Sequence, residues 1–162
     1  MKVIFLDVDG VLNCATTKER IGGFIGVEQK KIAVIRDIID ATGAKIVLSS
    51  TWRLDFIWSR EGKSVNLKAF NYLVEELRKQ NLEIFDVTPH HRDSWRGREI
   101  HDWIDNCGHD IESYVVIDDS IHDISTECKG HVVQTSWSTG IKPGAVKMAV
   151  VILNKDKKGC VQ

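Results

Sequence analysis

This chain lacks several features that would place it in a specialised class of protein. No apolar stretch among its 162 residues approaches the ~20 that a membrane-spanning helix needs. Neither charge dominates, because 22 basic side chains stand against 23 acidic ones for a formal charge of −1. That balance argues against a protein that coats nucleic acid or membranes by net charge, although a local basic patch stays open.

The cysteines are also too dispersed for several kinds of site. Cys14, Cys107, Cys128 and Cys160 are widely scattered, without a C-x-x-C pair or a His-Cys cluster at zinc spacing. No internal repeat or low-complexity segment occurs, and the first residues lead directly into an apolar run rather than into a signal peptide. We therefore expect a cytoplasmic protein with reduced thiols, folded as one domain over residues 1–162.

Two acids follow the first apolar run. Val3–Leu6 has the length and β-branched content of a strand buried on both faces, and Asp7 and Asp9 stand where it should end. Residues two apart in extended backbone point to the same side, so both carboxylates can face one space. They repel each other unless a proton or cation lies between them, and hard oxygen ligands favour Mg²⁺. Gly10 then lets the chain turn away without a blocking side chain. The alternative is a strand that ends in an ordinary Asp-Gly turn.

Apolar runs and helical spacing alternate along the rest of the chain. Strands are predicted over residues 3–6, 45–48, 82–87, 114–117 and 131–134. Helices are predicted over 28–42, 66–80, 99–107 and 142–153, with a weaker one over 120–128. The connections include a flap or hairpin over 13–26, a small insert over about 52–64 and a polar loop over 90–97. This alternation predicts an α/β fold with a mostly parallel sheet of about five strands and helices on both faces.

Polar side chains stand at three predicted strand ends. They are Asp7 and Asp9 after the first strand, Ser49, Ser50 and Thr51 after the second, and Asp118 and Asp119 after the fourth. Ligands of parallel sheets bind beyond these carboxyl ends, so we expect the three groups to converge. Such acids suit Mg²⁺ and a phosphate, and a carboxylate can attack phosphorus while a second acid moves the proton.

The segments V-I-F-L-D-V-D-G-V-L-N, K-I-V-L-S-S-T-W-R and Y-V-V-I-D-D-S resemble the motifs of the haloacid dehalogenase (HAD) superfamily of phosphotransferases. They are most similar to small HAD domains linked to RNA or nucleotide repair. The resemblance implies a three-layer Rossmann-like fold and an aspartyl-phosphate mechanism. It implies that Asp7 is nucleophile and Mg²⁺ ligand, and that Asp9 is general acid/base with its carbonyl on the metal. Asp119 is then the direct ligand of the second acid pair, and Asp118 helps to hold it.

The resemblance leaves two motif positions open. The phosphate-binding hydroxyl should be Ser50, with Ser49 as the alternative if the register shifts by one residue, and Gly10 would also lie against the phosphate. No lysine stands at the usual place of the third motif. Arg96 resembles that cation, and its guanidinium can bind two phosphate oxygens at once. Arg98 is the alternative, although we favour its being a solvated residue at the start of the helix.

The resemblance also bears on the substrate. The inserts are too short for a large cap, and open HAD sites tend to act on bulky substrates, so we predict a nucleotide or a nucleic-acid end phosphate. Aromatic and basic residues could line the rim: Trp52, Arg53, Trp58, Arg60, His90, His91, Arg92 and Trp95. Equally, the tryptophans could be partly buried. The alternatives are a non-catalytic Mg²⁺- and phosphate-binding module in a repair or regulatory complex and, less favoured, a carbon dehalogenase.

Overall fold

The computed structural model describes residues 1–93 and 95–155 of the chain. Its centre is a sheet in the order β5-β4-β1-β6-β7, and every neighbouring pair of these strands is parallel. The strands are β1 (Lys2–Leu6), β4 (Lys45–Leu48), β5 (Ile84–Val87), β6 (Ser113–Asp118) and β7 (Val132–Gln134). The predicted sheet of about five parallel strands is therefore confirmed. Cys160 lies outside the described residues.

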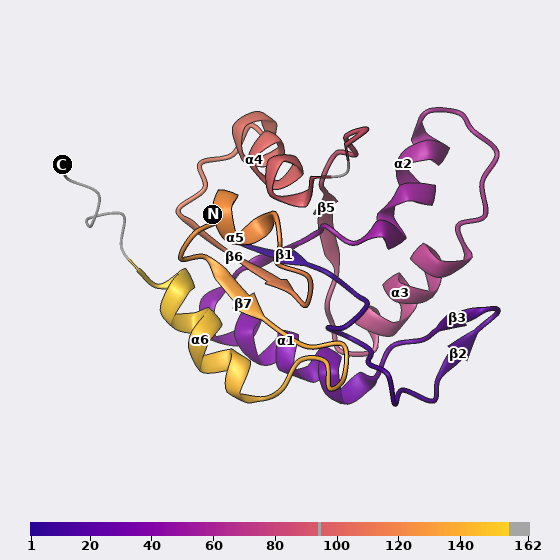
Figure 1. The fold of residues 1–162 in the computed structure, drawn as a ribbon, viewed down its shortest axis with the longest axis horizontal. Coiled ribbons are helices and arrows are strands. Elements are labelled where there is room, and N and C mark those ends of the chain that lie inside the picture. Colours follow the sequence, from indigo (N-terminus) through magenta and orange to yellow (C-terminus); the bar gives the residue numbers. More distant parts are fainter. Residues whose placement is uncertain (94, 156–162) are drawn as a thin grey trace.

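Helices cover both faces of this sheet, as Figure 1 shows. Alternate residues of β1 explain the two layers, since Ile4 and Leu6 face one helix layer while Val3 and Phe5 face the other. The first layer contains α1 (Gln29–Thr42), α3 (Lys68–Arg78) and α6 (Gly144–Leu153). The second contains α4 (Arg96–Asn106) and α5 (Ile124–Glu127). No helix in the described part is long and apolar enough to cross a membrane.

Helix α4 begins three residues before its predicted start at Glu99. Gly97 made the preceding segment look like a loop, but here it has a packing role. A Cβ on Gly97 would lie 2.7 Å from the Cβ of Glu127, so glycine lets α4 and α5 approach closely. The Gly97 amide also donates to Asp123 Oδ2 at 3.1 Å, which satisfies one free N–H of the helix start. Arg96 is thereby the first residue of the helix rather than part of the loop.

The other differences concern short elements. The weak helix predicted over 120–128 is reduced to α5, and Pro143 precedes α6 rather than standing inside its first turn. The predicted flap is a short antiparallel hairpin of β2 (Arg20–Ile21) and β3 (Phe24–Ile25). After β4 the chain forms the 3₁₀ turn η1 (Thr51–Arg53) and the helix α2 (Leu54–Arg60). These small elements form a minimal cap.

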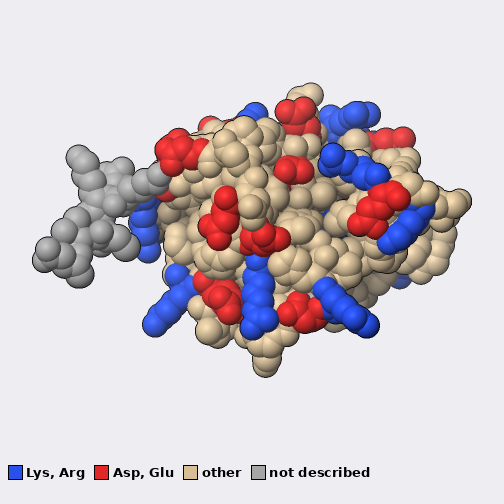
Figure 2. All heavy atoms as spheres, turned by 90° about the horizontal axis from the view of Figure 1, so that it is seen from above, with Lys and Arg blue, Asp and Glu red and all other residues tan. Residues whose placement is uncertain are grey.

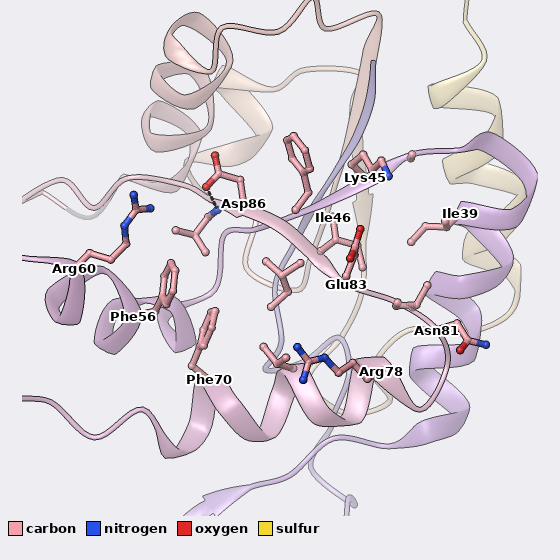
Figure 3. A pocket seen from close by; sticks show the side chains of 16 residues that line it. Ile39, Lys45, Ile46, Phe56, Arg60, Phe70, Arg78, Asn81, Glu83 and Asp86 are labelled. Carbon is pink, nitrogen blue, oxygen red and sulfur yellow. Dashed lines mark hydrogen bonds between the residues drawn. The ribbon is translucent and has the colours of Figure 1, made fainter.

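A groove of about 780 Å³ lies beside β5, one of the two edge strands of the sheet (Figure 3). Phe56 and Phe70 stack in it with their ring centroids 4.5 Å apart, and Arg60 and Arg78 also line it. None of the predicted acids lines this groove. On the face drawn in Figure 2, basic and acidic side chains are interspersed, as expected from the near-balanced charge.

Candidate active site

Three of the predicted acids come together at the carboxyl end of the sheet. Asp7 follows β1 directly and Asp118 ends β6, and these neighbouring strands are in register at Leu6 and Ile117. One carboxylate oxygen each of Asp7, Asp118 and Asp119 lies within 4.8 Å of the other two. Asp7 is 6% exposed and Asp118 is fully buried. The strand-end pattern therefore predicted a real cluster.

Arg96 supplies the positive charge beside this cluster. Its Nη1 atom donates to Asp118 Oδ2 and lies 3.3 Å from Asp7 Oδ1. Burial lowers the pKa of Arg96, but the nearby Asp7 and Asp118 outweigh burial and raise that pKa above its usual value. Arg96 is therefore permanently charged.

Arg98, the alternative for this position, lies elsewhere. It pairs with Asp93 at 3.1 Å and stacks over the ring of Trp95, with its side chain about half exposed. The structure brings Arg96 to the acids and leaves Arg98 at the surface. The helix explains this difference, because residues two apart on a helix point in different directions.

Asp7 and Asp118 hold protons more tightly than isolated carboxyls do. Burial raises the pKa of Asp7, against the opposing effects of Arg96 and of a hydrogen bond from Ser50. Burial also raises the pKa of Asp118 to about 7, with a further contribution from the charge of Asp7 and opposition from Arg96. Three carboxylates against one guanidinium leave an excess of negative charge. A divalent cation would neutralise it.

The donor set suits Mg²⁺, because hard carboxylate oxygens are the ligands this ion prefers. Both oxygens of Asp118 already have partners, Arg96 on one and the Ser120 amide at 2.8 Å on the other. The Asp119 carboxylate has no hydrogen bond or ion pair to another residue in the described part of the chain. Asp119 is thus the more available ligand, and Asp118 is the better anchored residue.

Gly10 shapes the floor of this cluster. Its φ of 72° is left-handed, and a Cβ placed there would lie 2.3 Å from Cγ of Asp119. Only glycine leaves that carboxylate its room. The Gly10 amide donates to Asn13 Oδ1 at 3.1 Å, and its carbonyl accepts from Thr135 Oγ1 at 2.7 Å. The turn after β1 is therefore fixed from both sides.

The Asp9 carboxylate does not join the group of three acids but has partners of its own. Its Oδ1 accepts a hydrogen bond from Asn13 Nδ2 at 2.8 Å, and its Oδ2 accepts one from Trp52 Nε1 at 2.9 Å. The sequence places Asn13 at the start of the predicted flap and does not predict its contact with Asp9. The quoted motif ends in this asparagine, which is the one signal the sequence offered.

The two serines after β4 differ in their surroundings although both are fully buried. Ser50 hydrogen-bonds the Asp7 carboxyl and lowers its pKa, and its Oγ also accepts from the Trp52 amide at 3.4 Å. The Ser49 hydroxyl has no hydrogen-bond partner among the described residues. Ser50 is the serine beside the acids.

Two candidates for the rim are interior, which agrees with the alternative of buried tryptophans for Trp52 and is a correction for Arg53. Arg53 is 2% exposed and Trp52 is 8% exposed, so neither can present a surface to a bulky substrate. Arg53 pairs with Glu99, which is equally buried, and its remaining donors reach backbone carbonyls. Trp95, by contrast, is 40% exposed. A single arginine in a polar run gives no sequence signal of burial, because its acceptors come from distant segments.

A parallel α/β sheet that gathers carboxylates, a serine hydroxyl and an arginine at its carboxyl ends defines a domain of the HAD superfamily. Residues 3–146 match the family described as the HAD domain in Swiss Army Knife RNA repair proteins. The chain belongs to this family. No curated protein matches the chain. Membership supports a phosphatase-type hydrolase or a related module at the level of the superfamily.

Proposed function

We propose that this protein is a Mg²⁺-dependent phosphomonoesterase that works through an aspartyl-phosphate. The observation that carries the proposal is the meeting of Asp7 with two further acids and Arg96 in one largely buried cluster. A binding module would need the acids and the metal ion, but it would not need a nucleophile such as Asp7 beside the guanidinium of Arg96. The arrangement supports transfer of a phosphoryl group to Asp7.

Each residue of the cluster has a proposed role. Asp7 and Asp119 would hold Mg²⁺ together with the backbone carbonyl of Asp9, while Asp118 stays anchored by Arg96 and the Ser120 amide. When bound, the ion supplies positive charge at the transferring phosphoryl group. The Ser50 hydroxyl and the Arg96 guanidinium would bind phosphoryl oxygens, since both lie beside Asp7.

The proposed reaction has two steps. Asp7 attacks phosphorus, the bond from phosphorus to the leaving oxygen breaks, and protonated Asp9 gives its proton to that oxygen. Water then attacks phosphorus and gives a proton to Asp9 as the bond from phosphorus to Asp7 breaks. Inorganic phosphate leaves, and the Asp7 carboxylate is restored. The two acids return to their starting protonation states, so the cycle needs no other reactant.

A nucleotide or nucleic-acid end is the proposed substrate class. The cap is only a short hairpin and a small helix, which leaves room for a large substrate. Exposed aromatic side chains stand on loops and on the hairpin, namely Phe24, Trp95 and Trp137. Such rings can stack on bases while cations contact the backbone, and Arg98 already stacks on Trp95. The description of the family, which names RNA repair proteins, agrees with this class.

The test is phosphate release from 3′- and 5′-phosphorylated oligonucleotides, free mononucleotides and p-nitrophenyl phosphate, with Mg²⁺ or with EDTA. We expect Mg²⁺-dependent turnover that Asp7→Asn abolishes, while Asp40→Asn on the exposed face of α1 leaves it unchanged. Faster turnover of oligonucleotides than of mononucleotides would favour a nucleic-acid end. Absence of turnover on every substrate, with Mg²⁺ still bound, would favour the binding module.

A further inference from the structure

The general acid/base proposed above is held by two side chains that the reaction scheme does not use. The Trp52 indole N–H contacts one oxygen of Asp9, and the Asn13 amide contacts the other, at 2.9 and 2.8 Å. The donors come from different parts of the sheet edge, since Trp52 lies in η1 after β4 and Asn13 follows β1. Asp9 is therefore held from the turn after β1 and from η1.

Both donors are themselves buried. Trp52 is 8% exposed and belongs to the main hydrophobic core, so its ring is locked by packing. Asn13 is fully buried, and its own oxygen accepts the Gly10 amide at 3.1 Å. With a single donor, the carboxyl group could still rotate while it kept that one hydrogen bond. Two donors on different oxygens fix both side-chain torsions of Asp9.

We propose that Trp52 is a positioning residue for Asp9, and that its indole N–H keeps this carboxyl aimed at the leaving oxygen. The inference rests on the proposed phosphatase function. Proton transfer depends on a donor held within hydrogen-bond reach of its target, and small displacements are costly. Each oxygen of Asp9 keeps a free lone pair beyond its N–H contact, so the held carboxyl can still carry and give up the proton.

The inference predicts a dependence on the leaving group. When the bond to the leaving oxygen breaks, a basic alkoxide needs the proton from Asp9, whereas a dinitrophenolate leaves without it. Loss of the indole N–H should therefore slow transfer from an alkyl or nucleoside phosphate and spare transfer from 2,4-dinitrophenyl phosphate. A general fault in folding, metal binding or phosphate binding would slow both substrates equally.

The experiment compares Trp52→Phe with wild type in single-turnover formation of the phosphoenzyme at saturating Mg²⁺. Phenylalanine keeps an aromatic ring in the core but has no N–H. General acid catalysis is worth roughly 10²–10⁴-fold, and a misaimed acid should lose part of it. We expect a loss of about tenfold or more with a nucleoside phosphate and less than about threefold with the dinitrophenyl ester. Trp103→Phe on α4 is the matched control, because it also removes a buried indole N–H, which donates to Asp86 Oδ2 at 2.7 Å, and it should change neither rate.

Should Trp52→Phe fail to fold, β-(3-benzothienyl)alanine at position 52 keeps the bicyclic shape and replaces N–H by sulfur. Its expected leaving-group pattern is the same. An equal effect on both substrates, or none on either, would overturn the positioning role and leave the proposed function standing. If the wild type transferred phosphate from neither substrate, the proposed function and this inference would both fall.

Discussion

Arg53 Nη2 donates to Glu99 Oε2 at 2.5 Å, and the two side chains are 2% and 3% exposed. This pair joins the turn after β4, which carries Ser50, to the first turn of α4, which begins with Arg96. The other donors of Arg53 contact four carbonyls, those of Ser49, Ser50, Thr88 and Pro89. All five N–H groups of the guanidinium thus have an acceptor. The Arg53–Glu99 pair therefore fixes the positions of Ser50 and Arg96 relative to each other.

Replacing Glu99 by Gln should therefore destabilise the protein strongly. The amide keeps the shape but leaves the buried charge of Arg53 without a counter-charge, and breaking a buried pair in this way costs roughly 3–5 kcal/mol. Urea unfolding of the metal-free protein measures the loss. Glu75→Gln on the exposed face of α3 is the control and should change stability by less than about 0.5 kcal/mol. A loss below about 1 kcal/mol for Glu99→Gln would show that Arg53 is held by its carbonyls alone.

Gly10→Ala should weaken Mg²⁺ binding more than it weakens the stability of the fold. The added Cβ would overlap the Asp119 carboxylate, and the left-handed φ adds strain of roughly 1 kcal/mol. We expect Mg²⁺ affinity, measured by isothermal titration calorimetry, to fall at least about tenfold, with a smaller loss of thermal stability. Gly43→Ala is the matched control, because Gly43 also has positive φ but no neighbour near its Cβ position. Equal Mg²⁺ affinity in both variants would refute a role for Asp119 as ligand.

The sequence predicted the acids of the cluster because their signal is local. An apolar run followed at once by Asp7, or by Asp118 and Asp119, already says that the acids stand at a strand end. Parallel pairing then places those ends side by side, which the order β4-β1-β6 confirms. The strand over 45–48 and the stop of α1 at Gly43 were likewise predictable from apolar runs and a left-handed glycine.

What the sequence could not predict depends on contacts between distant segments. The burial of Arg53 could not be predicted, because its acceptors are supplied by two strand ends and a helix. The early start of α4 could not be predicted for the same reason. The glycine at position 97 is required by the close approach of Glu127, which lies thirty residues further along the chain. The contact of Asp9 with Trp52 is of the same kind, because these residues are 43 apart in the sequence.

Mg²⁺ should stabilise the protein more at about pH 8 than at about pH 5. The pKa of Asp118 is raised from 3.8 to about 7, so the metal-free folded state binds more protons than the unfolded state between these values. Its stability therefore falls as the pH rises through that range. Mg²⁺ removes the cost of ionising the cluster, so its effect on the melting temperature should grow with pH. Asp118→Asn should weaken this pH dependence, and an equal Mg²⁺ effect at both pH values in the wild type would contradict the prediction.

Arg96→Met tests whether this arginine serves the phosphate or only the acids. Without the guanidinium, Asp118 and Asp7 lose their positive neighbour, so Mg²⁺ becomes the remaining charge that can offset them, and its stabilising effect should increase. Binding of a phosphate analogue should weaken instead, because charge-assisted hydrogen bonds to phosphoryl oxygens are lost. We expect inhibition by vanadate to weaken at least about tenfold in Arg96→Met. Arg98→Met, on the same helix but paired with Asp93, should leave it unchanged. If vanadate bound equally well to both variants, Arg96 would be a partner of Asp118 and not the third-motif cation.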